Sequence, residues 1–116
     1  MTKKSSGGSQ YVDIKIDIGF PPFLKQLQEI DPQYLEEFSQ KIVLIQKMTW
    51  DDVYKTSSKG RNKRGLNYEQ IDQKTDDDKN IASIRITGKH RARVCRDGIW
   101  MRFISLHPDH DSAYKK

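Results

Sequence analysis

The sequence contains few of the features that define several common classes of protein. Its 116 residues include one cysteine, Cys95, so the chain can form no internal disulfide, which suits a reducing cytoplasm. The longest apolar run, Ile42 to Ile45, is far shorter than the roughly 20 residues of a membrane-spanning helix, so we expect no membrane contact. No cysteine pair is present to hold zinc. The composition therefore predicts a cytoplasmic protein without metal or cofactor.

Arginine is absent from the first 60 residues, which use only lysine as a permanent cation. All seven arginines lie between Arg61 and Arg102, although the net charge of the whole chain is only +5. A guanidinium binds phosphate through two parallel hydrogen bonds, whereas an ammonium acts as a hydrated point charge. This segregation favours a phosphate-binding surface in the C-terminal half, and a solvated basic sheet face is the alternative.

The first half of the chain predicts one strand followed by helices. Residues 11–18 alternate apolar and polar, which is typical of a half-buried strand. Pro21 and Pro32 stand where helices begin, and Leu35, Phe38 and Ile42 follow the second proline at helical spacing. The stretch from Thr49 to Asp52 resembles a capping box that starts a short helix. We expect residues 1–10 to be a flexible N-terminal arm, and residues 11–116 to form a single domain with a long polar loop at about 55–80.

Three short strands are expected in the second half, at about 82–87, 90–96 and 99–106, with Asp97-Gly98 as a hairpin turn. This turn predicts Val94 opposite Met101, with the apolar side chains on one face under the helices. The sequence therefore predicts an α+β fold, with an N-terminal strand, two helices and a C-terminal antiparallel meander. The other face would expose four arginines to solvent: Arg85, Arg91, Arg93 and Arg102.

Like charges on neighbouring strands repel each other unless a polyanion lies over them, so this arrangement predicts contact with a phosphate backbone. Trp100 and Ile104 fall on the same face, where they would stack on a base or pack under a loop. A second basic cluster, with Arg61, Lys63 and Arg64, lies in the polar loop. It would bind RNA or form a solvated basic loop.

The C-terminal stretch HPDHDSAY, residues 107–114, gathers titratable groups next to the predicted arginine face. Metal-free RNA cleavage needs a base for the 2′-OH, an acid for the leaving oxygen and positive charge on the phosphate. His107 and His110 can transfer protons near pH 7, and Tyr114 can stack on a base or donate a proton. A solvated tail is the alternative, and a metal site at the histidines and aspartates is a third.

The order of elements and residues 81–114 resemble the RelE/ParE toxin family. The stretch SIRITGKHRARVCRDGIWMRFISLHPDHDSAY is similar to that family's basic strand, glycine turn, central arginine strand, hairpin and polar C-terminus with a tyrosine. The chain lacks the arginine that RelE itself has near residues 107–109, and its loop before the meander is longer. The resemblance implies a RelE-like fold, a cognate antitoxin as partner, and no cofactor.

Residue by residue, the resemblance implies functional roles at several positions. Arg91 matches the arginine after the glycine turn, Arg85 matches a basic position on the preceding strand, and Tyr114 matches the C-terminal tyrosine of the nucleases. His107 and His110 stand where family members differ. We therefore expect an endoribonuclease that cleaves mRNA in the ribosomal A site; the alternative is a non-catalytic binding protein, either a ParE-like poison of DNA gyrase or an RNA-binding module.

Overall fold

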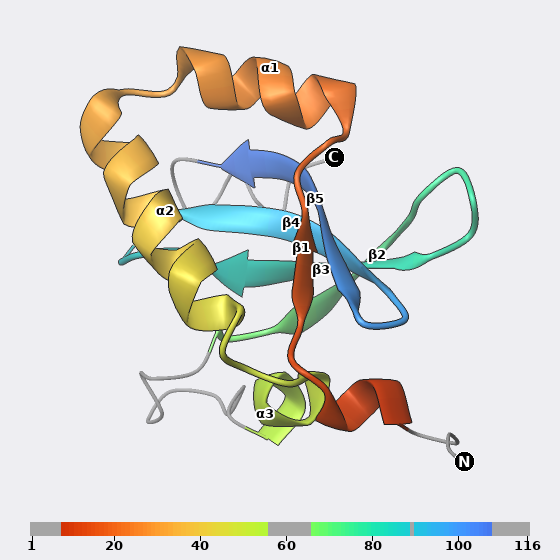
Figure 1. Ribbon diagram of the computed structural model, residues 1–116. Coiled ribbons are helices and arrows are strands. Elements are labelled where there is room, and N and C mark those ends of the chain that lie inside the picture. The colour runs from red at the N-terminus through yellow and green to blue at the C-terminus, as the bar shows by residue number, and fades with distance from the viewer. Residues whose placement is uncertain (1–7, 56–65, 89, 108–116) are drawn as a thin grey trace.

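The computed structural model describes residues 8–55, 66–88 and 90–107, and it confirms the α+β class (Figure 1). Three helices pack with a five-stranded sheet whose strand order is β1-β5-β4-β3-β2. The elements are η1 (Gly8–Tyr11), β1 (Lys15–Asp17), α1 (Pro21–Glu29), α2 (Pro32–Ile45), α3 (Trp50–Lys55), β2 (Glu69–Lys74), β3 (Asn80–Arg85), β4 (Arg91–Asp97) and β5 (Trp100–His107). In the described part of the chain, no helix is long and apolar enough to cross a bilayer.

The three helices begin where the sequence places their start signals. Helix α2 starts at Pro32, and the Asp31 carboxylate caps it by accepting a hydrogen bond from the Tyr34 amide at 2.9 Å. The capping box of α3 is confirmed, because the Thr49 amide donates to Asp52 and the Asp52 amide donates to the Thr49 hydroxyl. These side chains satisfy amides that have no partner within the helix.

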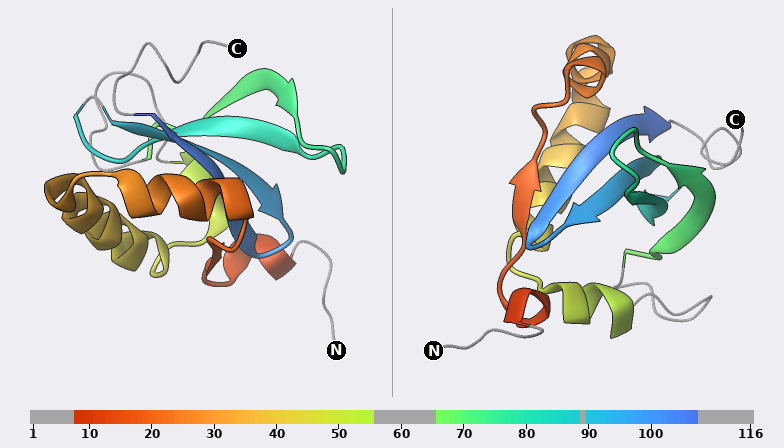
Figure 2. Two further views of the ribbon diagram at one scale, coloured as in Figure 1. Left: turned by 90° about the horizontal axis from the view of Figure 1, so that it is seen from above. Right: turned by 90° about the vertical axis from the view of Figure 1, so that its right-hand side faces the viewer.

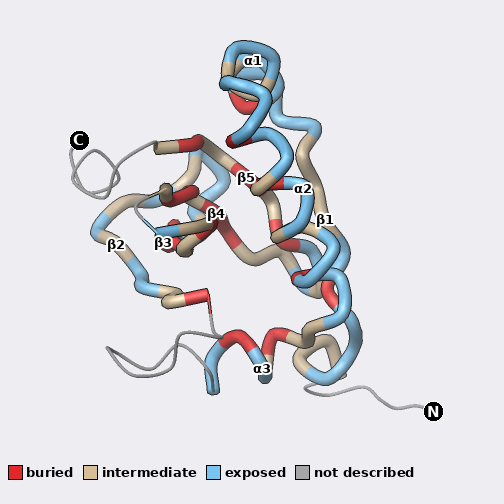
Figure 3. The backbone as a smooth tube through the Cα atoms, turned by 90° about the vertical axis from the view of Figure 1, so that its left-hand side faces the viewer, coloured by how far each residue is buried: buried red, intermediate tan, exposed pale blue. Residues whose placement is uncertain are grey.

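Helices α1 and α2 cover one face of the sheet, which we call the inner face (Figure 2). Three aromatic rings form the centre of this layer: Phe23 of α1, Phe38 of α2 and Phe103 of β5 lie with ring centroids 5.4–5.8 Å apart. The buried face of α2 differs from the predicted one. Leu35, which the apolar spacing placed on the buried face, is 40% exposed, whereas the neighbouring Tyr34 is buried. Figure 3 shows that burial is concentrated along the strands and on the sides of the helices that face them.

The predicted register of the β4–β5 hairpin is wrong by two residues. Asp97 pairs with Trp100, so the two-residue turn is Gly98-Ile99 and Val94 lies opposite Phe103. Gly98 has φ +63°, a left-handed conformation that costs a residue with a Cβ about 1–2 kcal/mol. Because this error is an even number of residues, the predicted faces survive from Trp100 to Phe103. Past Phe103 the extra residue Ile104 makes the error three residues, which places Ser105 and His107 on the outer face. Strand β3 is likewise shifted by two residues, with Arg85 opposite Arg91 instead of Arg93.

Two segments that the sequence assigned to irregular structure are ordered elements. Strand β2 lies inside the expected loop at 55–80, at the edge of the sheet beside β3. Its sequence EQIDQK has one apolar residue because an edge strand needs little burial, and its backbone pairing comes from β3. Residues 8–10 of the expected arm belong to η1, where Ser9 accepts a hydrogen bond from Arg96 at 3.0 Å.

The turn that sets this register gives a direct test of its backbone conformation. Gly98→Ala should lower the free energy of unfolding by about 1–2 kcal/mol, because alanine disfavours positive φ. Gly88→Ala is the matched control, since Gly88 has no such φ and no atom would lie within 4 Å of its Cβ. Equal denaturant midpoints for the two variants would show that this turn does not require a left-handed residue.

Candidate nucleic-acid interface

The face of the sheet opposite α1 and α2, the outer face, carries two rows of polar side chains across β3, β4 and β5. The arginine–histidine row consists of Arg85, Arg91 and His107, which are direct register partners. The serine–arginine row, formed by Ser83, Arg93 and Ser105, lies two residues further along each strand. The rows are therefore roughly 7 Å apart, which is close to the distance between successive phosphates of an extended nucleic-acid strand.

Arg91 lies in the middle of the arginine–histidine row, but its side chain does not extend into solvent as expected. The residue is only 7% exposed. Its Nη1 donates to the carbonyl oxygens of Thr87, Gly88 and His90 at 2.9–3.2 Å. Arg91 thus holds the β3–β4 connection in place and supplies a fixed positive charge to this end of the outer face.

Arg93 and Arg85 are half-buried on the same face. Arg93 donates to the side-chain oxygen of Gln73 at 3.2 Å, and burial lowers the pKa of its guanidinium. Burial, and then the positive charge of Arg85, lower the pKa of Lys41 on α2. The effect of Arg85 on Lys41 shows that these two cations lie close enough to interact, whereas the pKa shift of Arg93 reflects burial alone.

Arg102, which the sequence assigned to the same RNA-binding surface, is surrounded by carboxylates. Its guanidinium nitrogens lie 3.0 Å from Asp97, 3.5 Å from Asp77 and 3.8 Å from Asp17. Asp77 belongs to the turn between β2 and β3, which the sequence had assigned to the loop. A guanidinium with three such neighbours adds little net charge for a phosphate, so the cationic part of the face is smaller than predicted.

His107 is held in position by contacts from two elements. Its Nε2 lies 2.9 Å from the Ser105 hydroxyl, a hydrogen bond that can fix the tautomer of the ring. The Gln26 side chain of α1 accepts from the Leu106 amide at 2.9 Å and donates to the Leu106 carbonyl at 3.1 Å. Gln26 thus replaces a neighbouring strand at the end of β5, and the backbone that carries His107 is fixed.

A cluster that sequence reasoning missed supports the backbone of Arg91 from the helical side. Tyr34 of α2 stacks on His90 with ring centroids 3.9 Å apart, and its hydroxyl lies 3.5 Å from the Arg91 carbonyl. Burial raises the pKa of Tyr34 to about 12, so the hydroxyl stays protonated. Glu37 lies 3.6 Å from His90 Nδ1. In the sequence, the only signal for this cluster is the spacing of Tyr34 and Glu37 along α2, and this spacing does not predict a contact with His90.

The remaining predicted site residues divide into two groups. Arg61, Lys63 and Arg64 of the basic cluster, and His110 and Tyr114 of the C-terminal stretch, lie outside the described residues. Trp100 and Ile104 lie on the outer face side of β5, where Trp100 is 44% exposed and Ile104 lines a pocket with Arg102. Cys95 is buried, and burial raises the pKa of its thiol, so it is not an activated nucleophile.

The fold and site together define an α+β protein whose sheet carries arginines and a histidine at one end of its outer face. No protein-family model, curated protein or solved structure matches the chain.

The burial of Arg91 predicts that truncating its side chain destabilises the fold. Arg91→Ala should lower the free energy of unfolding by about 1–3 kcal/mol, because three carbonyl groups of the β3–β4 connection lose a charged donor. The more exposed Arg85→Ala is the control and should change the stability by less than about 0.5 kcal/mol. Urea unfolding of the two variants measures this difference, and an unchanged Arg91→Ala variant would contradict a structural role.

Proposed function

We propose that this protein is an endoribonuclease toxin that cuts mRNA on the outer face of its sheet. The observation that supports this best is the arginine–histidine row, which brings Arg85, Arg91 and His107 together from three neighbouring strands. A cationic surface with a proton-transfer group at its edge has the components that cleavage of a phosphodiester requires. The resemblance of residues 81–114 to RelE-like toxins supports the same assignment.

The reaction would use the RNA's own 2′-OH as the nucleophile. A base removes the 2′-OH proton, the oxygen forms a bond to the adjacent phosphorus, and the bond to the 5′-oxygen breaks as an acid protonates that oxygen. The products are a 2′,3′-cyclic phosphate and a 5′-OH, so no oxidant, metal or cofactor is consumed. Arg85 and Arg91 would stabilise the additional negative charge that develops on the phosphate.

Three side chains are proposed for the proton transfers. His107 lies in the row itself, and its hydrogen bond to Ser105 orients the ring. His110 and Tyr114 follow His107 by three and seven residues in the sequence. A chain of seven residues spans at most about 25 Å, so the sequence separation would allow both side chains to reach a phosphate that binds at the row. In this proposal His110 is the main acid or base, and Tyr114 stacks on a base or donates a proton.

The proposed activity also defines partners and a location. A nuclease that acts on mRNA in the ribosomal A site would work in the cytoplasm, and an antitoxin protein would keep it inactive until needed. An acidic antitoxin segment would be attracted to the same cationic end of the outer face. Because Arg102 is already surrounded by carboxylates, its pairing with the antitoxin should matter less than that of Arg85.

The decisive experiment compares growth inhibition and mRNA cleavage in variants of the C-terminal stretch. His110→Ala should reduce cleavage by a factor of about 10²–10⁴, as expected for the loss of a general acid or base, and Tyr114→Ala should reduce it less. Lys116→Ala is the matched control and should cleave normally. Cleavage should continue in EDTA with the ribosome kept intact, and the products should end in 2′,3′-cyclic or 3′-phosphate.

The alternative functions give different results in the same experiment. A His110→Ala, Tyr114→Ala double variant that still inhibits growth, leaves mRNA uncut and blocks DNA gyrase would establish a gyrase poison. A wild-type protein that binds RNA but never cuts it, on or off the ribosome, would establish a non-catalytic RNA-binding module. Either outcome would overturn the nuclease proposal.

A further inference from the structure

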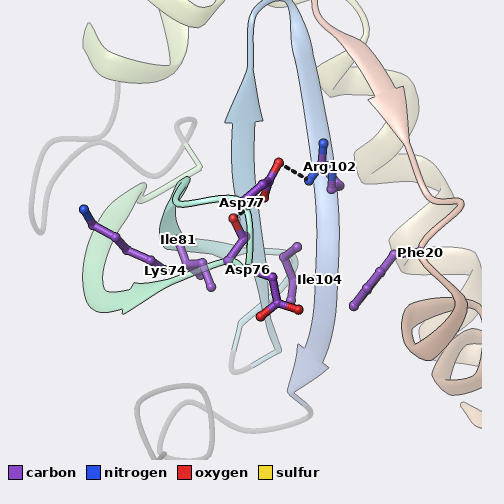
Figure 4. A pocket seen from close by; sticks show the side chains of 8 residues that line it. Phe20, Lys74, Asp76, Asp77, Ile81, Arg102 and Ile104 are labelled. Atoms are coloured by element: carbon purple, nitrogen blue, oxygen red, sulfur yellow. Dashed lines mark hydrogen bonds and ion pairs between the residues drawn. The ribbon is translucent and has the colours of Figure 1, made fainter.

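A pocket of about 350 Å³ lies on the outer face, beyond the serine–arginine row. Its apolar lining comes from three segments that are distant in the sequence: Phe20 before α1, Ile81 of β3 and Ile104 of β5 (Figure 4). Lys74, Asp76, Asp77 and Arg102 supply the charged groups around it. An apolar pocket of this size with a few polar groups is typical of a site for a small ring system.

The charged groups of the pocket differ in how they are engaged. Asp77 lies 3.5 Å from Arg102, which also contacts Asp97. The Asp76 carboxylate has no hydrogen bond or ion pair with any residue in the described part of the chain, and Figure 4 shows it on the β2–β3 turn near the pocket. The mouth of the pocket thus offers a carboxylate that can accept two hydrogen bonds and a guanidinium that can donate them.

The position of the pocket suggests which part of a ligand enters it. Arg102 is the register partner of Cys95, which lies two residues along β4 from Arg93 and four from Arg91. The pocket is therefore roughly 7 Å from the serine–arginine row and roughly 13 Å from the arginine–histidine row. The carboxylates around Arg102 would repel a phosphate, whereas an uncharged ring with hydrogen-bonding edges would fit an apolar pocket with a polar mouth.

We propose that this pocket binds the guanine base of a single-stranded RNA whose phosphates lie on the two arginine-containing rows. Guanine presents two adjacent donors, N1–H and N2–H₂, which match the two oxygens of the Asp76 carboxylate. Its O6 and N7 acceptors match the Arg102 guanidinium. Adenine, cytosine and uracil lack this combination of edges. The inference rests on the proposed function, because it requires that RNA binds to the outer face.

Binding of fluorescent RNA oligonucleotides to the full-length protein tests this pocket. The probes are oligouridylates that carry one guanosine, one inosine or one adenosine at the same position. The His110→Ala variant is used throughout, so that cleavage does not interfere. Guanosine should bind about tenfold more tightly than adenosine, and inosine, which lacks the 2-amino group, should lose most of that gain.

Two matched variants connect the preference to the pocket. Asp76→Asn should remove the preference for guanosine over inosine, because the amide offers one acceptor in place of two. Asp72→Asn removes the same charge from the adjacent strand β2, and Asp72 does not line the pocket. It should therefore keep the wild-type preference for guanosine.

The outcomes separate this inference from the proposed function. RNA binding that weakens in Arg85→Ala or Arg93→Ala, without any base preference, would overturn the pocket and leave the RNA-binding surface intact. Failure of every oligonucleotide to bind, together with mRNA that stays uncut on the ribosome, would overturn both. An Asp76→Asn variant that binds RNA normally but loses a co-expressed protein partner would show that the pocket is a protein-docking site instead.

Discussion

Strand β5 must find hydrogen-bond partners for its backbone on both sides, and the way it does so determines the arrangement of the outer face. On one side it pairs with β4 along its length. On the other side β1 is only three residues long, so it covers only the beginning of β5, and the Gln26 side chain bonds both backbone groups of Leu106 near its end. The β4–β5 register shifts between Arg93 and Val94, so that Ile104 is an extra residue on β5. This shift places His107 opposite Arg91.

The sequence predicts much of the fold because its local signals are strong. The caps and prolines specify the starts of the helices, and the alternation of apolar residues separates the inner from the outer face of β3–β5. The exact pairing of β4 with β5 was not predictable, since Gly98 can occupy either position of a two-residue turn, as Asp97-Gly98 or as Gly98-Ile99. Strand β2 was not predictable either, because a polar edge strand has no alternation and depends on β3 for its pairing.

The site was predictable in its chemistry and less so in its electrostatics. The segregation of the arginines predicts a cationic sheet face, and Arg85, Arg91 and Arg93 lie together on that face. The partners of Arg91 and Arg102 could not be read from the sequence. The carbonyl groups around Arg91 belong to the predicted turn between β3 and β4, but the pattern does not indicate that an arginine side chain bonds them. Asp77 reaches Arg102 only because β2 pairs with β3.

The separation of charge along the strands lets one face carry two kinds of site. Positive charge gathers at the arginine–histidine row, while the carboxylates of Asp17, Asp77 and Asp97 gather around Arg102. The two ends are roughly 13 Å apart along β4. At physiological ionic strength the Debye length is about 8 Å, so charges that face solvent at one end are largely screened from those at the other. A phosphate at the arginine–histidine row would therefore feel the guanidinium groups much more strongly than the distant carboxylates, and the acidic end can differ in chemistry without weakening the cationic end.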